Sequence, residues 1–450
     1  MADAGTPDAP RLMRVEDAQA RILELARRSG PGEAGAVEEL AVEAALGRVL
    51  AEDVAAAVTL PPWDNSAMDG YAIRSADVGA ATEAAPHRLE VTGEVAAGQA
   101  AGARVEAGSA IRIATGAPIP PGADAVVPVE ATTPLDAAGR AGTRGRDAVG
   151  AVPAAVLVHE AIAAGAHVRR AGSDLHAGDR LLESGAALGP AQVALLAGAG
   201  LGRVRVHRRP RVGVLATGDE VRPAGEPRGA AGIPDANGPG LRALVSAAGA
   251  DPIDLGIARD DLADVLARLE RALGAGADAV VVAGGVSVGP YDVVKAAFER
   301  LGRVELWRVA VQPGKPFALA TAGPVLLFGL PGNPVSGFVT FELFVRPAIR
   351  AIAGRRDPFR PVDRGVLLDE ARTSRGRRAY LRVTAERQPG GGVDRDPEGR
   401  ARLRLAKGPA GQGSHVLSAL ATAEALAIVP EDVEVHRAGD PVAVLWLDAP

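Results

Sequence analysis

Apolar and polar residues follow two different patterns along the chain. Between residues 211 and 352, apolar β-branched runs alternate with segments whose apolar positions recur at helical spacing. This alternation predicts β-α-β units that form a mostly parallel sheet with helices on both faces. On either side of that region, short strand-like segments are separated by Gly and Pro, which predicts smaller β-rich domains. An amphipathic helix is also predicted over residues 15–28.

The predicted strands of the α/β region end in polar segments. The strands are 212–216, 253–257, 279–283, 304–309 and 325–328, and the predicted helices are 240–248, 262–273, 291–301 and 335–352. Ligands of a parallel sheet bind beyond the carboxyl ends of its strands. The segments found there are TGDE (217–220), RDD (259–261), GGVSVGPYD (284–292), QPGKP (312–316) and PGNP (331–334). These segments are therefore expected to share one rim of the sheet.

The glycine-rich segment 284–292 is the clearest candidate for a phosphate site. Gly284, Gly285 and Gly289 allow a tight turn that brings backbone N–H groups close to a ligand. Ser287 adds a hydroxyl donor. A helix is predicted to follow, and an anion is favoured at a helix N-terminus. Asp292 stands at that entrance, where a carboxylate either caps the helix or bridges a metal ion beside a phosphate.

Acidic residues recur on the same rim. Clustered carboxylates repel one another unless a cation or protons intervene, so that Mg²⁺ with phosphate oxygens is the chemistry that fits them. Each acid or glycine alone can be explained as a cap or a turn residue, but the five segments together favour an anion and metal site. The glycines match neither GxxxxGK[ST] nor GxGxxG, which disfavours a P-loop triphosphatase and a dinucleotide-binding dehydrogenase.

Composition narrows the class of protein. A chain of 450 residues is too long for one ordinary core, so several domains are expected. The net charge of −5 makes nucleic acid an unexpected partner. The absence of cysteine excludes disulfides, thiolate metal sites and a cysteine nucleophile, and it fits a reducing compartment. Without a signal peptide or a long apolar run, the chain is expected to be cytoplasmic and to have no membrane partner.

Two motifs outside the α/β region combine turn-forming residues with aromatic, methionine or histidine side chains. In PPWDNSAMDGYA (61–72), Asp64 and other turn formers interleave with Trp63, Met68 and Tyr71. A compact loop packed on its own aromatic residues and a ligand-binding loop both explain that composition. The other motif, GQGSH (411–415), is a polar loop, and a lone histidine such as His415 is more often structural than catalytic.

Seven motifs occur in the order in which they are found in molybdopterin molybdenumtransferases. They are PPWDNSAMDGYA (61–72), IRIATGAPIPPGADAVV (111–127), TGDE (217–220), GGVSVGPYD (284–292), QPGKPFA (312–318), GLPGNPVS (329–336) and GQGSH (411–415). From about residue 14 to residue 447, the chain thus resembles this family, which comprises the bacterial MoeA proteins and the E domain of gephyrin.

The resemblance implies a multidomain α/β fold. An N-terminal helix and elongated segment are expected at 14–60, with a return part of that segment at 166–209. The remaining parts are a β-rich lobe carrying the DNSAMDGY loop at 61–165, a doubly wound, molybdopterin-binding α/β domain at 210–355, and a C-terminal β-barrel at 360–450.

The resemblance also implies an activity and an assembly. The expected enzyme takes adenylylated molybdopterin and molybdate, inserts molybdenum between the dithiolene sulfurs, and releases AMP in a step that needs Mg²⁺ as cofactor. A homodimer is expected, whose active cleft combines the α/β and C-terminal domains of one subunit with the β-rich lobe of the other. Molybdopterin adenylyltransferase and molybdoenzymes are further expected partners.

Matching positions carry the family's site residues onto this chain. Asp292, Asp260 and Glu220 are expected to hold the metal ion and to act in catalysis. Asp64, Thr115 and Asp174 are expected to join the catalytic site from the partner subunit. The residues expected to bind the pterin and its pyrophosphate are Gly284, Gly285, Ser287, Gly289, Pro331, Asn333, Pro334, Asp219 and Asp235. Those expected to bind molybdate are Lys315, Pro316, Arg382 and Ser414.

The chain departs from the family pattern at several positions. Gln312 stands where lysine is frequent, which predicts weaker molybdate binding. Ala236 and Gly238 remove a hydroxyl and a guanidinium near the expected pterin site, and Ala283 replaces a frequent serine. Two other functions stay open: a scaffolding homologue without catalysis, and a molybdopterin adenylyltransferase. The additional N-terminal and C-terminal domains argue against the latter.

Overall fold

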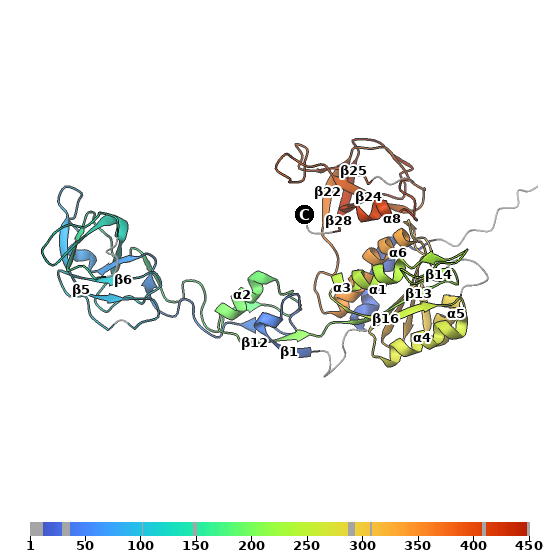
Figure 1. Cartoon of the computed structure of the whole chain (residues 1–450), viewed down its shortest axis with the longest axis horizontal. Helices are drawn as coiled ribbons and strands as arrows, with labels where there is room; N and C mark the ends of the chain where they lie inside the picture. Colours follow the sequence, from blue (N-terminus) through green and yellow to red (C-terminus); the bar gives the residue numbers. More distant parts are fainter. Residues whose placement is uncertain are drawn as a thin grey trace, which may run out of the picture. The chain divides into compact units, whose positions relative to one another are not determined.

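The chain folds into two compact units in its computed structural model (Figure 1). The structure describes residues 12–28, 37–100, 102–146, 151–286, 293–306, 308–406 and 411–447. Unit 1 comprises Met1–Glu52, Ser184–Gly189 and Arg203–Pro450, and unit 2 comprises Asp53–Glu183 and Pro190–Gly202.

Unit 2 is built on a six-stranded sheet with the strand order β7-β4-β6-β5-β9-β8. Its strands are β4 (Gly70–Ile73), β5 (His87–Val95), β6 (Ser109–Ile113), β7 (Ala125–Pro128), β8 (Thr132–Leu135) and β9 (Ala155–Val158). Both faces of β4 are buried: Tyr71 and Ile73 pack in one apolar cluster and Ala72 packs in another. Successive side chains of a strand point to opposite faces, so that a nearly continuous apolar run serves two cores. This region confirms the predicted β-rich lobe.

Shorter elements complete unit 2. Two antiparallel pairs are formed by β2 (Val54–Ala55) with β11 (Arg180–Leu182) and by β3 (Asn65–Ser66) with β10 (Val168–Arg169). Helix α2 spans Pro190–Gly198, and single 3₁₀ turns span Ser75–Asp77 and Val129–Ala131.

Unit 1 contains the predicted α/β sheet, in the strand order β16-β13-β17-β21-β20-β18. The strands are β13 (Arg211–Thr217), β16 (Asp251–Ala258), β17 (Ala279–Ala283), β18 (Arg303–Leu306), β20 (Ala318–Ala322) and β21 (Val325–Leu330). Neighbours from β16 to β21 pair in parallel, which confirms the prediction of a mostly parallel sheet. The carboxyl ends of these four strands therefore meet at one edge.

Helices cover both faces of this sheet. They are α1 (Val15–Arg28), α3 (Asn237–Ala247), α4 (Leu262–Gly274), α5 (Val293–Leu301), α6 (Pro334–Thr340) and α7 (Arg346–Ile352), with a π-helical turn (Phe341–Val345) between the last two. Val281 of β17 packs in the same core as Ile22 of α1 and Ile349 of α7. Val280, its neighbour in β17, packs on the other face with Leu269 of α4 and Phe298 of α5. Full burial on both faces explains why β17 is apolar at every position.

The prediction of a strand at residues 304–309 is wrong in its extent. β18 ends at Leu306, and Val311–Gln312 forms β19, which pairs with the C-terminal sheet instead. The strand that fills this part of the sheet is β20, which is antiparallel to β21 and has no distinctive apolar period. QPGKP still lies on the expected rim, because the beginning of an antiparallel strand shares an edge with the ends of its parallel neighbours.

The C-terminal part of unit 1 is a closed five-stranded barrel, as predicted. Its strands are β22 (Val362–Leu367), β24 (Arg378–Ala385), β25 (Ala401–Leu405), β26 (Ala425–Val429) and β28 (Pro441–Trp446), and pairing of β24 with β26 closes it. β23 (Ala371–Arg372) pairs with β27 (Val435–His436), and α8 spans Leu417–Ala421. Closure leaves the barrel without free edges among these strands.

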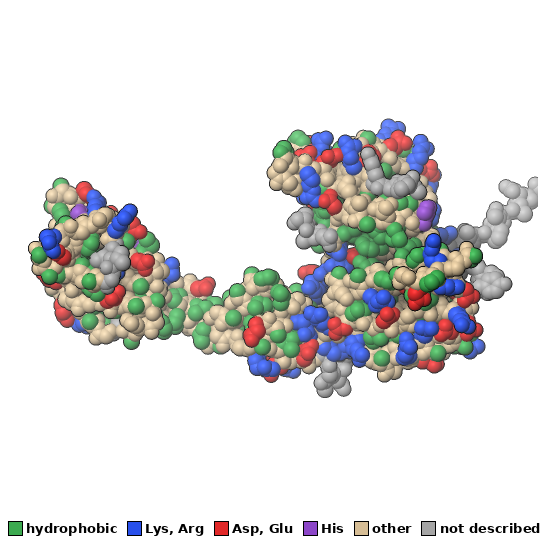
Figure 2. All heavy atoms as spheres, viewed as in Figure 1, with side chains coloured by type: hydrophobic (Ala, Val, Ile, Leu, Met, Phe, Trp, Pro, Cys, Tyr) green, Lys and Arg blue, Asp and Glu red, His purple; other side chains and the backbone are tan. Residues whose placement is uncertain are grey.

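The remaining described elements of unit 1 are short. β1 (Val37–Ala41) pairs with β12 (Arg203–His207), a 3₁₀ turn spans Val42–Ala44, and β14 (Val221–Arg222) pairs with β15 (Ile233–Pro234). Acidic and basic side chains are interspersed on the faces visible in Figure 2. None of the helices within the described ranges is long and apolar enough to cross a membrane.

Candidate functional site

A cavity of about 600 Å³ opens at the rim where the parallel strands end. It is lined by Thr217, Gly218, Glu220, Val221, Ile233, Pro234, Asp235, Ala236, Asn237, Asp260, Gly284, Gly285, Val286, Pro316, Pro331, Gly332, Asn333, Pro334 and His415. Segments that follow β13, β16, β17 and β21 thus meet here, together with the beginning of β20. The volume is in the range of small-molecule and cofactor sites. Nine residues predicted for the site contribute to its wall.

The glycine loop after β17 lies against the end of β13. Gly284 and Gly285 have positive φ angles of 101° and 64°, a conformation that other residues rarely adopt. A Cβ atom at Gly284 would lie 2.5 Å from Thr217 Oγ1, and one at Gly285 would lie 2.6 Å from Val294 Cγ2. Glycine is therefore required here both by the turn and by close packing, which brings this backbone to the cavity wall.

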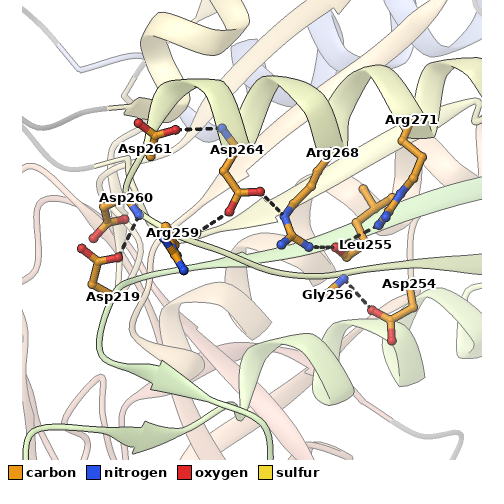
Figure 3. Close-up of polar contacts among 10 residues, drawn as sticks. All are labelled: Asp219, Asp254, Leu255, Gly256, Arg259, Asp260, Asp261, Asp264, Arg268 and Arg271. Atoms are coloured by element: carbon orange, nitrogen blue, oxygen red, sulfur yellow. Dashed lines mark hydrogen bonds and ion pairs between the residues drawn. The ribbon is translucent and has the colours of Figure 1, made fainter.

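Carboxylates lie beside this loop, at the ends of β13 and β16. The backbone N–H of Asp260 donates to Asp219 Oδ1 over 3.4 Å (Figure 3). Burial, and the negative charges of Asp219 and Glu220, raise the pKa of the Asp260 carboxyl above its usual value. Asp260 and Glu220 both line the cavity, whereas Asp219 faces an adjoining cavity of about 1020 Å³. The three acids are thus close enough to repel one another.

A divalent cation suits these two cavity carboxylates. In the described part of the chain, no three acidic or histidine side chains are grouped so as to hold a metal ion by themselves. Mg²⁺ is commonly bound through one or two carboxylates together with phosphate oxygens of a substrate. Asp260 and Glu220 match that donor set in chemistry and number.

The N-terminus of α3 forms another part of the wall. Asp235 Oδ1 accepts a hydrogen bond from the backbone N–H of Gly238 over 2.9 Å, and a Cβ atom at Gly238 would come within 2.4 Å of Asp235 Oδ2. The Asn237 side-chain amide donates to the Gly332 carbonyl over 2.8 Å. Asn237 therefore ties α3 to the PGNP loop. Ala236, which lines the cavity, and Gly238 contribute neither a hydroxyl nor a guanidinium at this end of α3.

The GQGSH loop of the C-terminal barrel is held by Arg382. This side chain is 1% exposed, and its guanidinium donates to Gln412 Oε1 over 3.3 Å, to the Gly413 carbonyl over 2.9 Å and to the Gly411 carbonyl over 3.4 Å. Burial lowers the pKa of Arg382 from its usual value. Beyond this anchor, Ser414 Oγ accepts a hydrogen bond from Asn333 Nδ2 over 3.1 Å. The barrel loop and the PGNP loop thus meet beside the cavity.

The QPGKP loop approaches the cavity from another side. Pro316 lines the cavity, while the Lys315 side chain is exposed and is not part of the wall. Gln312 Oε1 accepts a hydrogen bond from the backbone N–H of Ser374 over 2.8 Å. An amide oxygen can accept this bond and an ammonium group cannot, so that the glutamine at this position ties the loop to the barrel.

Asp64, Thr115 and Asp174 all lie in unit 2. Asp64 accepts hydrogen bonds from Arg170 Nη1 over 2.6 Å and from the backbone N–H of Ala171 over 2.8 Å, which lower its pKa. Thr115 donates through its hydroxyl to Asp69 Oδ1 over 2.9 Å. Asp174 is exposed. Their predicted contribution to a site shared between subunits stays a prediction.

Three predicted site residues, Ser287, Gly289 and Asp292, lie outside the described residues. Two further residues whose side chains hold the loops of the site in place were not predicted from the sequence. Asn237 bridges α3 to the PGNP loop, and Gln412 Oε1 accepts a hydrogen bond from the Arg382 guanidinium. Both are amides beside a glycine, and Gln412 lies in the GQGSH motif. An amide next to glycine is also typical of an ordinary turn, so the sequence does not distinguish a bridging side chain from a turn residue.

Comparisons with known proteins agree with this architecture. Residues 13–200 match the MoeA N-terminal region (domain I and II), residues 213–351 match a probable molybdopterin binding domain, and residues 364–447 match the MoeA C-terminal region (domain IV). These three matches together cover most of the chain.

Relatives and solved structures extend the likeness to whole chains. Molybdopterin molybdenumtransferase 2 of Mycobacterium tuberculosis (strain CDC 1551 / Oshkosh) is 38% identical over 89% of this chain and 92% of that protein. Molybdopterin molybdenumtransferase of Bacillus subtilis (strain 168) is 32% identical over 92% and 90%. A crystal structure of the molybdopterin biosynthesis MoeA protein from Pyrococcus horikoshii covers 98% of this chain and all of that one, with a TM-score of 0.74 and 30% identity. The chain therefore belongs to the MoeA family of molybdopterin molybdenumtransferases, enzymes of molybdenum cofactor biosynthesis.

Proposed function

We propose that this enzyme inserts molybdenum into adenylylated molybdopterin, with molybdate as the second substrate and AMP as a product, in a Mg²⁺-dependent step that forms the molybdenum cofactor. The observation that carries the proposal is the convergence of Glu220, Asp260, the Gly284-Gly285 backbone, Asn333 and His415 on one cavity. This set supplies backbone and side-chain donors for phosphate oxygens, and carboxylates for a cation beside them.

Each part of the cavity has a distinct task in the proposed reaction. The backbone at Gly284 and Gly285 binds the pyrophosphate, because glycine lets the main chain approach a phosphate closely. Asp235 accepts hydrogen bonds from the amino and ring N–H groups of the pterin through the oxygen that does not cap α3. Asp260 and Glu220 would hold Mg²⁺, which would supply positive charge beside the phosphate oxygens during cleavage.

Molybdate is a tetrahedral dianion and needs donors that replace its hydration. Ser414 and Lys315 are proposed to donate to it, while Pro316 shapes the wall beside them. Arg382 acts on this pocket chiefly by fixing the loop before Ser414, since three of its guanidinium N–H groups are used by that loop. A charge-assisted hydrogen bond contributes about 1.5–3 kcal/mol, so the Lys315 ammonium is the strongest single donor proposed.

The direct test combines purified enzyme with adenylylated molybdopterin, molybdate and Mg²⁺. We expect AMP release and product that reconstitutes a molybdenum-free molybdoenzyme. Chelation of Mg²⁺ is expected to abolish both signals. An adenylyltransferase would instead consume ATP with molybdopterin and need no molybdate, and a scaffolding homologue would release no AMP. Either result would contradict the proposal.

We also propose a homodimer in which Asp64, Thr115 and Asp174 complete the cavity of the partner subunit. Two separately inactive variants, Asp64→Asn and Asp260→Asn, are expected to regain activity when their subunits are mixed and allowed to exchange. Random pairing in a twofold dimer restores one intact site in half of the dimers, which predicts about a quarter of wild-type activity. Gel filtration of the mixture gives the dimer mass. If both variants stay inactive although exchange is shown by mass spectrometry, these acids serve the same subunit's cavity.

A further inference from the structure

Arginines gather where α7 ends and the chain continues toward the barrel. Arg346 and Arg350 lie one helical turn apart on α7, and Arg355 and Arg360 lie in the segment before β22. We call these four residues the arginine cluster. Arg346 is 7% exposed, and the other three are partly buried. None of them lines the 600 Å³ cavity.

The cluster contains more positive charge than its surroundings balance. Glu342, whose side chain is 2% exposed, is the carboxylate paired with it within the described ranges: Oε2 lies 2.8 Å from Arg360 Nε and 3.7 Å from Arg346 Nε. Arg350 and Arg355 form no ion pair with a described residue. Arg350 Nε is buried and has no hydrogen-bond partner there.

This imbalance is energetically costly. Burial and the neighbouring guanidinium groups lower the pKa of Arg350 to about 9 and that of Arg346 to about 10. Buried charges in proteins are ordinarily paired, because an unpaired ion loses hydration without a compensating attraction. A group of four arginines around one carboxylate is therefore expected to have a further anionic partner.

The geometry points to a phosphate-like oxyanion as that partner: we propose that the arginine cluster is a second oxyanion-binding site, separate from the cavity. Planar guanidinium groups present paired N–H donors whose spacing matches the oxygens of phosphate and similar anions. Arg350 brings a buried donor without a partner, and Arg355 brings a partly exposed one. The partial exposure of Arg350, Arg355 and Arg360 gives a small anion access. Anion binding by the arginine cluster does not depend on the proposed reaction.

Isothermal titration of the full chain with inorganic phosphate tests the proposal, with molybdate and AMP as further titrants. We expect one phosphate per chain in this site, bound at least about tenfold more weakly by Arg350→Gln and by Arg355→Gln, since each removes charge-assisted hydrogen bonds. Molybdate competing for the site would mark a free oxyanion as its ligand, and AMP competing more strongly would mark a phosphate ester. Thermal unfolding shows whether each variant remains folded.

Two variants separate this site from other sources of phosphate binding. Arg300→Gln removes an exposed arginine in the last turn of α5 and is expected to bind phosphate like the wild type. Lys315→Gln alters the proposed molybdate pocket and is expected to keep this phosphate site. Equal phosphate affinity of Arg350→Gln, Arg355→Gln and the wild type would overturn the proposal. So would a change of particle mass in Arg350→Gln without a change in phosphate binding, because the cluster would then pair with a carboxylate of a second copy.

Discussion

Asp260→Asn is expected to reduce AMP release by about 100-fold or more, because it removes a negative charge from the pair proposed to hold Mg²⁺. The substituted amide has the same shape, and the Asp260 backbone N–H that donates to Asp219 is retained. Binding of adenylylated molybdopterin should therefore change much less than turnover. Single-turnover measurement of AMP, with substrate binding followed separately, distinguishes the two effects.

The neighbouring residue provides a matched control for this substitution. Asp261 caps α4, where its Oδ1 accepts from the backbone N–H of Asp264 over 2.9 Å, and it lines neither of the two adjoining cavities. Asparagine caps a helix about as well as aspartate. Asp261→Asn should therefore keep its activity. A loss as large as that of Asp260→Asn would show that overall charge at this rim, not the Asp260 carboxylate, controls turnover.

The same carboxyl group also makes a prediction for stability. Its pKa is raised in the folded state, so ionised Asp260 destabilises the fold, and stability falls as pH rises through its unfolded and folded pKa values. At neutral pH without Mg²⁺, Asp260→Asn should be slightly more stable than the wild type, by less than about 1 kcal/mol because solvent screens an exposed group. The difference should vanish below the unfolded pKa. Added Mg²⁺ should raise the thermal midpoint of the wild type more than that of the variant.

Arg382→Met is expected to destabilise unit 1 and to abolish most activity together. Methionine nearly fills the space, but it removes the guanidinium that donates to the Gly411 and Gly413 carbonyls, and it leaves Gln412 Oε1 with the backbone N–H of residue 382 as its donor. A buried acceptor that loses its partner costs about 1–3 kcal/mol, but Gly411 is exposed and Gly413 is partly buried, so water recovers part of the cost and a loss of about 1–3 kcal/mol is expected. Urea unfolding followed by the intrinsic fluorescence of the three tryptophans, of which Trp446 lies in β28, measures it.

A second arginine in the barrel shows whether burial is the cause. Arg402 lies in β25, is exposed, and pairs with Asp394 over 3.4 Å. Arg402→Met should cost about 0.5 kcal/mol or less, because exposed ion pairs contribute little. Arg382→Lys should be intermediate, since lysine keeps the charge but cannot reproduce the guanidinium's spaced donors. If Arg382→Met were as stable as Arg402→Met, the Arg382 contacts would not hold the loop.

Much of this fold could be predicted from local sequence signals. Helix α1 was predicted with the bounds found, because its apolar residues form one stripe and Gly-Pro-Gly follows soon after. β17 was predicted because five consecutive small or β-branched apolar residues suit a strand buried on both faces. β20 was missed, because the mostly small residues of ALATA show no clear contrast between apolar and polar positions. Its place in the sheet depends on pairing with β21.

Part of the candidate site could also be predicted from the sequence, and part could not. The order of strands and glycines in the sequence determined that TGDE, Gly284-Gly285 and PGNP each follow a parallel strand. The ends of parallel strands meet at one edge of a sheet, so these segments meet there. Only the tertiary structure decided that Asn237 links α3 to the PGNP loop and that Ser414 of the barrel contacts Asn333. It also decided that the Arg382 guanidinium forms its hydrogen bonds with the GQGSH loop. Helix and strand formation and turn chemistry depend on residues that are near one another in the chain, and they leave a periodic trace in the sequence. Hydrogen bonds between segments that are far apart in the chain depend on where the backbones finally lie, and no spacing in the sequence encodes that distance.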